Sequence, residues 1–330
     1  MDQMLTLAAN NLLSPIILSF ALGVAASLAR SDLAVPEAAA KALSIYLLFA
    51  IGFKGGVSVA DHGIDAKLGL TLLAGILLSF ALPIMAFALL QVMTQLSRLD
   101  AAAVAAHYGS ISIVTFVAGT SVLESSGITA EGYMVAVAAA MEAPAILSAL
   151  WLISRGGGGA DEDGRRMDGQ LMREILLNGS IVLLVGSFFI GWITGADGLD
   201  SISSFIVAPF QGVLCLFLLD MGLVAGRGLR GGSGVLKPGV LVFGVLMPLI
   251  GSASGLLAGL LLGLSTGGVA LMMVLSASAS YIAVPAAMRV ALPEANPSIY
   301  LTLSLGVTFP FNLTLGLPLY VAIAAALTGA

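Results

Sequence analysis

Cysteine and charge are both scarce in this 330-residue chain. The single cysteine, Cys215, excludes an internal disulfide framework and a cysteine metal cluster. Charged residues make up 9% of the chain, and no basic run points to nucleic acid. With only two histidines, the chain also lacks the HExxH motif of zinc proteases. These absences argue against a disulfide scaffold, a nucleic-acid-binding protein and a metalloprotease.

Apolar residues are abundant in this chain. They make up 59% of the chain, and the mean hydropathy is +1.07, so most of the surface must face lipid. The apolar runs are long and do not alternate as barrel strands do, which predicts an all-α integral membrane protein. The first run lacks a basic region before it and reads as a retained helix rather than a signal peptide. At about 20 residues per span, we predict ten transmembrane helices. The predicted spans are 12–29, 36–53, 68–93, 100–120, 132–153, 174–194, 203–225, 236–264, 268–290 and 298–327.

The positive charges predict the orientation of these spans. An N-terminus outside leaves only Lys54 and Lys67 at the outer side and puts the other lysines and arginines in the cytoplasm, as the positive-inside rule requires. Residues 155–172 are rich in glycine and charge and predict a flexible cytoplasmic linker. We therefore expect one five-helix repeat at 1–154, a second at 173–330, and both termini outside.

The two halves resemble each other at an offset of about 165 to 168 residues. FKGGVSVADHG (53–63) matches LDMGLVAGRGL (219–229), and HYGSISIVTFVAG (107–119) matches LSASASYIAVPAA (275–287). Because five spans is an odd number, the second repeat must be inverted relative to the first. Inverted repeats are typical of secondary transporters, whose halves exchange outward and inward states about a fixed site. The alternative is that apolar helices look alike by chance.

Small polar residues interrupt the fourth and ninth predicted spans, in HYGSISIVT (107–115) and SASAS (276–280). Serine at every second residue does not form a helical face, so we predict two broken helices at the midplane whose freed backbone groups line a cavity. Half-helix N-termini suit an anion, and C-terminal carbonyls suit Na+. The alternative is close helix packing through small residues. The predicted substrate-binding residues are Gly109, Ser110, Ser112, Ser276, Ser278 and Ser280.

Glu142 lies in the middle of the fifth predicted span, where an ionised carboxylate needs a cation, a polar partner or water. We predict that it is a Na+ ligand or a proton carrier; the alternative is a protonated or hydrogen-bonded structural acid. Its counterpart in the second repeat lies around TFPFN, which adds Thr308 and Asn312 as predicted Na+ ligands. Thr115 completes that set. We expect no transition-metal site and no cofactor beyond Na+ as the coupling ion.

Four further polar residues are left outside the predicted site. Lys54 and Asp220 occupy matching ends of the second and seventh predicted spans, and snorkelling to the membrane interface explains both. His62 falls in a predicted external loop. His107 precedes Ser110 by three residues, but this pair lacks the G-x-S-x-G elbow of a serine hydrolase, and the histidine reads as a packing residue. We therefore expect no enzyme activity.

Several of these motifs resemble the sodium-dependent bicarbonate transporter family. They are YGSISIVT, AMEAPA, SASYIAVPAAMRVALPEANPSIYL and FPFNLTLGLPLY, and the resemblance covers nearly the whole chain. This chain departs from the family in the ninth predicted span. The family pattern there is similar to SSSD, which ends in an aspartate, whereas this chain has Tyr281 after Ser280. The resemblance implies core and gate domains, a homotrimer, and inward Na+-coupled bicarbonate uptake by an elevator-like movement in the cytoplasmic membrane. It also implies a PII-like regulatory protein on the cytoplasmic face.

Two other functions remain open at this stage. One is Na+- or H+-coupled symport of another small anion, such as sulfate or a small carboxylate, because related inverted five-plus-five folds carry different cargo. The other, from a different class, is an intramembrane enzyme, for which the sequence offers only the Ser110 and His107 pair.

Overall fold

The computed structural model describes residues 13–63, 65–155, 177, 179–231, 237–281, 284–285, 288 and 292–329. Throughout these ranges the regular elements are helices and no strand occurs, so the predicted all-α class is confirmed. Apart from residue 155, the predicted linker at 155–172 lies outside the described part of the chain.

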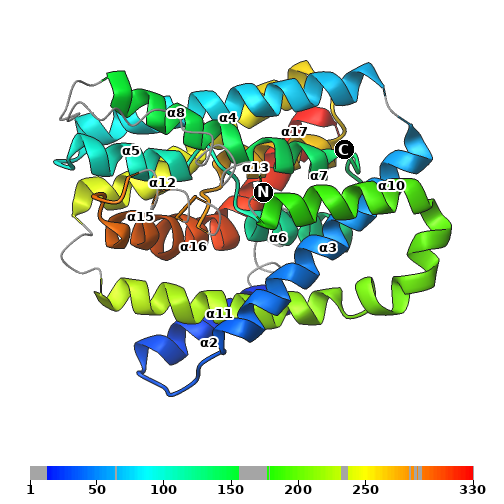
Figure 1. The fold of residues 1–330 in the computed structure, drawn as a ribbon, viewed down its shortest axis with the longest axis horizontal. Helices are drawn as coiled ribbons and strands as arrows, with labels where there is room; N and C mark the ends of the chain where they lie inside the picture. The colour runs from blue at the N-terminus through cyan, green and yellow to red at the C-terminus, as the bar shows by residue number, and fades with distance from the viewer. Residues whose placement is uncertain are drawn as a thin grey trace.

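Four helices form one group along the lower and right-hand parts of Figure 1. They are α2 (Pro15–Leu28), α3 (Glu37–His62), α10 (Gly179–Ile206) and α11 (Phe210–Gly231), and we call them the frame helices. α2 packs against α11, and α3 packs against α10, so each close pair joins one helix from each half of the chain.

Glycines bring the frame helices together. A Cβ atom on Gly222 of α11 would overlap the Phe20 carbonyl oxygen of α2, and a Cβ on Gly56 of α3 would overlap the Phe188 carbonyl oxygen of α10. Backbones approach this closely in membrane proteins where the interface residues are small, because dispersion contacts and not the hydrophobic effect drive the association.

The remaining helices form the rest of the molecule (Figure 1). From the first half these are α4 (Ala66–Met93), α5 (Arg98–His107), α6 (Ile113–Ser125), α7 (Met134–Ala140) and α8 (Glu142–Arg155). From the second half they are α12 (Pro238–Leu261), α13 (Thr266–Ala277), α15 (Pro297–Leu303), α16 (Phe309–Phe311) and α17 (Leu317–Thr328), with π-helical turns η1 (Ser304–Thr308) and η2 (Asn312–Gly316). α4 and α12 each contain an internal proline, Pro83 and Pro248.

Seven helical segments of the described chain are long and apolar enough to cross a membrane, which makes this a multi-pass membrane protein. They coincide with seven of the ten predicted spans. The other three, 12–29, 100–120 and 268–290, overlap the shorter apolar helices α2, α6 and α13. The count of ten spans therefore stays a prediction.

One predicted helix boundary is wrong and another is partly right. The predicted end of the sixth span at residue 194 coincides with a kink at Gly195, whose φ of 58° suits glycine because it has no Cβ. The residues between this kink and Ile206 are helical, however, where the predicted spans leave a gap at 195–202. The second span was expected to end at residue 53, but α3 runs to His62. Lys54 and Asp220 consequently lie within α3 and α11 rather than at helix ends. Asp220 is buried, which contradicts the snorkelling interpretation for this residue.

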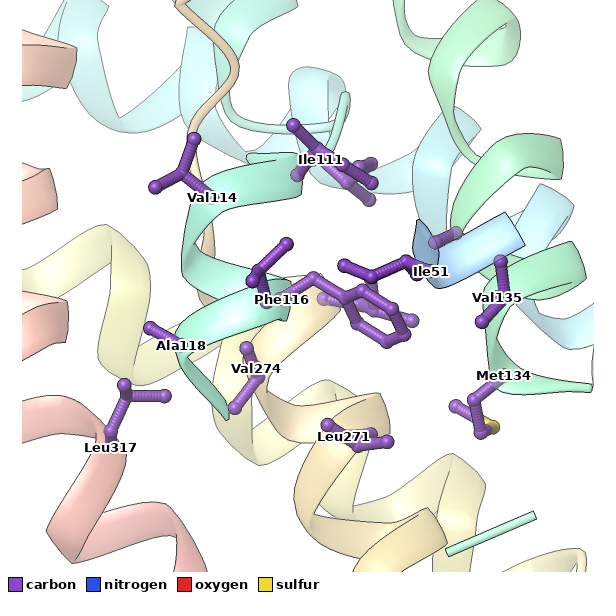
Figure 2. Packing of buried hydrophobic residues seen from close by; sticks show 14 of the residues in the cluster. Ile51, Ile111, Val114, Phe116, Ala118, Met134, Val135, Leu271, Val274 and Leu317 are labelled. Carbon is purple, nitrogen blue, oxygen red and sulfur yellow. The ribbon is translucent and has the colours of Figure 1, made fainter. Parts of the chain in front are cut away.

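A buried apolar cluster joins the frame helices to the rest of the molecule. Figure 2 shows Phe116 of α6 beside Ile51 of α3, with Met134 and Val135 of α7 and Leu271 of α13 around them. Phe116 is completely buried. This packing fixes α6, and with it the break at which α6 begins, against the frame.

Candidate functional site

The fourth predicted span is a broken helix in the structure. α5 ends at His107, and α6 begins at Ile113 with Ser112 as its N-cap. The Ser112 hydroxyl accepts a hydrogen bond from the Thr115 N–H at 3.2 Å, as N-cap serines do. The ninth predicted span loses its helical conformation after Ala277, and residues 278–281 are non-helical.

The two broken segments contact each other through hydrogen bonds that their backbone N–H groups donate. The Ser112 N–H donates to the Ser278 hydroxyl at 2.9 Å. The Ser280 N–H donates to the His107 carbonyl oxygen at 2.7 Å. We call the place where the non-helical residues 108–112 and 278–281 meet the crossing. Some backbone groups that lose their helical hydrogen bonds at the two breaks find partners here, as a low-dielectric interior requires.

Two predicted substrate-binding serines already have partners at this crossing. The Ser278 hydroxyl accepts from Ser112 and donates to the Leu275 carbonyl oxygen at 2.9 Å, so its hydrogen-bonding capacity is largely used. The Ser112 hydroxyl accepts from both the backbone N–H and the hydroxyl of Thr115, the latter at 2.9 Å. Thr115, predicted as a Na+ ligand, therefore supports the Ser112 cap in this structure.

Ser110 and Glu142 form a second buried contact. The Ser110 hydroxyl donates to the Glu142 Oε2 atom at 2.9 Å, and Glu142 is 6% exposed at the start of α8. This bond brings one predicted substrate residue and one predicted Na+ ligand together. It also fits the alternative interpretation of Glu142 as a hydrogen-bonded structural acid, because the serine partly offsets the cost of burying a carboxyl group.

Gly109 lies where the break passes closest to α4. A Cβ atom at this position would overlap Pro83 and the Ser79 carbonyl oxygen. The Ser79 hydroxyl in turn donates to the carbonyl oxygen of Met141, the residue between α7 and α8, at 2.6 Å. Gly109 thus serves close packing of the break against α4, and any backbone contact with a substrate is an additional role.

Asn312 and Thr308 bond to separate parts of the surroundings. Asn312 donates through Nδ2 to the Ala277 carbonyl oxygen at the end of α13, at 2.8 Å, and accepts at 2.8 Å from the Tyr320 hydroxyl. Thr308 donates to the Gly244 carbonyl oxygen at 2.7 Å. The four predicted Na+ ligands therefore bond to different partners in this structure, and Asn312 is the one that lies directly at a half-helix C-terminus.

Three buried tyrosines were missing from the predicted site. The Tyr108 hydroxyl is 2.6 Å from Thr308 Oγ1, Tyr320 bonds to Asn312, and Tyr281 follows Ser280 in the non-helical segment. A tyrosine within a membrane span is itself a signal, because its buried hydroxyl needs a hydrogen-bond partner.

The two remaining substrate predictions, Ser276 and Ser280, are both buried at the end of α13 and just beyond it. The Ser276 hydroxyl makes no hydrogen bond to the described residues. Ser280 reaches the other break through its backbone N–H, whereas the prediction also included its hydroxyl.

A cavity of about 400 Å³ extends along the second half of α6, between the frame helices and the rest of the molecule. Phe116, one turn after the Ser112 cap, is part of its lining. At its mouth Lys54 of α3 forms a 2.8 Å salt bridge with Glu124 at the end of α6. The cavity thus reaches from an exposed ion pair toward the crossing.

Comparison with known proteins identifies the family of this chain. The family described as the Na+-dependent bicarbonate transporter superfamily matches residues 15–325, which is nearly the whole chain. No curated protein matches the sequence significantly.

Proposed function

The chain belongs to the Na+-dependent bicarbonate transporter superfamily, and from this premise we propose that it carries bicarbonate into the cell together with Na+, at the crossing of its two broken helices. The residues at 107–119 and 275–287 predict a membrane transporter. The family match and the long apolar helices agree with this prediction. Secondary transport rather than catalysis is the proposed activity.

The observation that carries the proposal is the hydrogen bond from Ser112 N–H to Ser278 across the two breaks. The positive end of the α6 dipole lies at this point and favours an anion. The C-terminal ends of α5 and α13, with their carbonyl groups, lie at the same point and favour a cation. A site that combines both polarities suits an anion carried with Na+.

We further propose an inverted-repeat, elevator-like mechanism in which the frame helices are the gate domain and the remaining helices are the core. The frame pairs support the repeat, because the close contact of Gly23 with α11 has a counterpart in the contact of Gly191 with α3. Gly23 and Gly191 are 168 residues apart, and Gly222 and Gly56 are 166 apart, as the sequence offset requires.

The positions of the lysines support the proposed orientation, with the termini outside the cytoplasmic membrane. Lys54 pairs with Glu124, and Lys67 lies near the start of α4. Lys237 instead borders a cavity with Thr94, at the other end of α4. Lys67, predicted to be outside, thus lies at the opposite end of α4 from Lys237, predicted to be cytoplasmic.

A homotrimer and a PII-like regulator on the cytoplasmic face complete the proposal, and both rest on the family resemblance. The alternative cargo is another small anion, such as sulfate or a small carboxylate, with Na+ or H+. The crossing supports an anion and does not by itself select bicarbonate.

The test is uptake of labelled bicarbonate into proteoliposomes that contain the purified protein, with and without an inward Na+ gradient. Sulfate and small carboxylates serve as competitors. We expect Na+-dependent accumulation that unlabelled bicarbonate reduces and the other anions do not. Accumulation of a competitor in place of bicarbonate would favour the alternative cargo, and Na+-independent uptake would contradict the coupling.

A further inference from the structure

Tyr281 occupies an unusual position beside the crossing. It lies in the non-helical segment after Ser280 and is 8% exposed. Its ring packs edge-on against Phe309 at a centroid distance of 5.3 Å, and Phe309 packs in the same way against Phe20 of the frame helix α2, also at 5.3 Å. This aromatic row fixes the tyrosine between the crossing and the frame.

The Tyr281 hydroxyl lies close enough to the Ser112 side chain to interact with it, but it makes no hydrogen bond of good geometry to a described residue. Buried polar groups in native proteins are nearly always paired, and an unpaired one reduces stability. The ring is held by its apolar neighbours, so a phenylalanine would satisfy the packing equally well. The hydroxyl therefore needs an explanation other than folding.

Ser112 adds a second hydroxyl at the same place. Its oxygen accepts two hydrogen bonds from Thr115, which uses both of its acceptor positions and leaves its proton for another acceptor. If Ser112 donates that proton to Tyr281, the phenolic proton still lacks an acceptor among the described residues. The pair thus offers at least one free donor, the phenolic O–H group, while the Ser112 oxygen can accept no further hydrogen bond.

Such a donor suits an anion, and the Ser112 oxygen has no lone pair left for Na+, because Thr115 already uses both of its acceptor positions. We propose that the Tyr281 hydroxyl, together with Ser112, donates to an oxygen of the transported anion and so sets the affinity for a small oxyanion. This inference rests on the proposed function, and it names a residue outside the predicted site. The aromatic row through Phe309 holds the donor in place.

The proposal predicts opposite effects on stability and on transport for Tyr281→Phe. The substitution keeps the ring contacts and removes an unpaired buried hydroxyl, so the substrate-free protein should unfold at a higher temperature. The KM for bicarbonate uptake should rise about tenfold, the loss expected for a hydrogen bond to a charged group, while the Na+ concentration for half-maximal uptake stays within twofold.

Tyr133→Phe is the matched control, because the Tyr133 hydroxyl is also buried and unpaired among the described residues but lies at the start of α7. It should leave the KM unchanged. A Tyr281→Phe protein whose KM for bicarbonate stays within twofold of the wild type overturns this inference alone. A wild-type protein that carries no bicarbonate overturns the proposed function, and the Tyr281 variant is then compared for the anion that is carried. An unchanged KM for that anion overturns the inference as well.

Discussion

The backbone N–H of Ser112 donates to the hydroxyl of Ser278, and the two residues are 166 residues apart in the chain. This separation is the offset at which the two halves of the sequence resemble each other. A residue in the break of the first half therefore bonds to its near-equivalent in the break of the second half. Such a contact is expected where two related halves meet about a pseudo-two-fold axis.

Ser278→Ala should destabilise the crossing and impair uptake. The substitution removes the acceptor of the Ser112 N–H and leaves a buried donor unpaired, at a cost of about 1–3 kcal/mol. We expect a lower unfolding temperature in detergent and a loss of Na+-dependent uptake. Ser254→Ala is the control, because the Ser254 hydroxyl bonds only within α12, to the Ile250 carbonyl oxygen. Equal uptake by both variants would remove Ser278 from the site.

Glu142→Gln should separate the functional and structural interpretations of this acid. Glutamine still accepts the hydrogen bond from Ser110, so the fold should persist, but the negative charge that a cation needs is lost. We expect the Na+ concentration for half-maximal uptake to rise at least about tenfold, as loss of one strong ligand implies. Glu124→Gln, at an exposed ion pair, should have little effect. Unchanged Na+ dependence in Glu142→Gln would make this acid structural.

Asn312→Leu should destabilise the protein by at least about 2 kcal/mol, because the Ala277 carbonyl and the Tyr320 hydroxyl each lose a buried partner. Adding Tyr320→Phe should recover part of this loss, since it removes one of the two unpaired groups. Unfolding of the single and double variants in detergent measures the coupling. Strictly additive losses would show that the bond between Asn312 and Tyr320 contributes nothing.

Gly56→Leu should prevent α3 from packing against α10, because even a Cβ atom overlaps the Phe188 carbonyl oxygen. We expect low yield and aggregation on size-exclusion chromatography. Gly69→Leu is the control, since no atom lies within 4 Å of a Cβ at that position in α4. A well-folded Gly56→Leu protein would mean that the two helices separate at little cost, which would contradict a rigid frame pair.

The locations of the breaks could be predicted from the residues, because alternating serines cannot form a helical face in lipid. The family could also be recognised from YGSISIVT, AMEAPA and the C-terminal motifs. The helix boundaries were less predictable. Nothing in local hydropathy distinguishes a loop at 195–202 from the kinked continuation of α10, and the kink depends on the backbone conformation of Gly195.

The roles of individual site residues depended on contacts that no local pattern contains. The sequence alone determined that this chain spans a membrane and that small polar residues interrupt two of its predicted spans, because composition and periodicity report burial in lipid directly. Only the tertiary structure decided that Ser278 accepts from Ser112, that Ser110 donates to Glu142, and that the Tyr281 hydroxyl lacks a hydrogen bond of good geometry within the described part of the chain. Hydrogen bonds between residues far apart in the chain are set by how the helices cross, and that geometry is fixed by the packing of the whole fold.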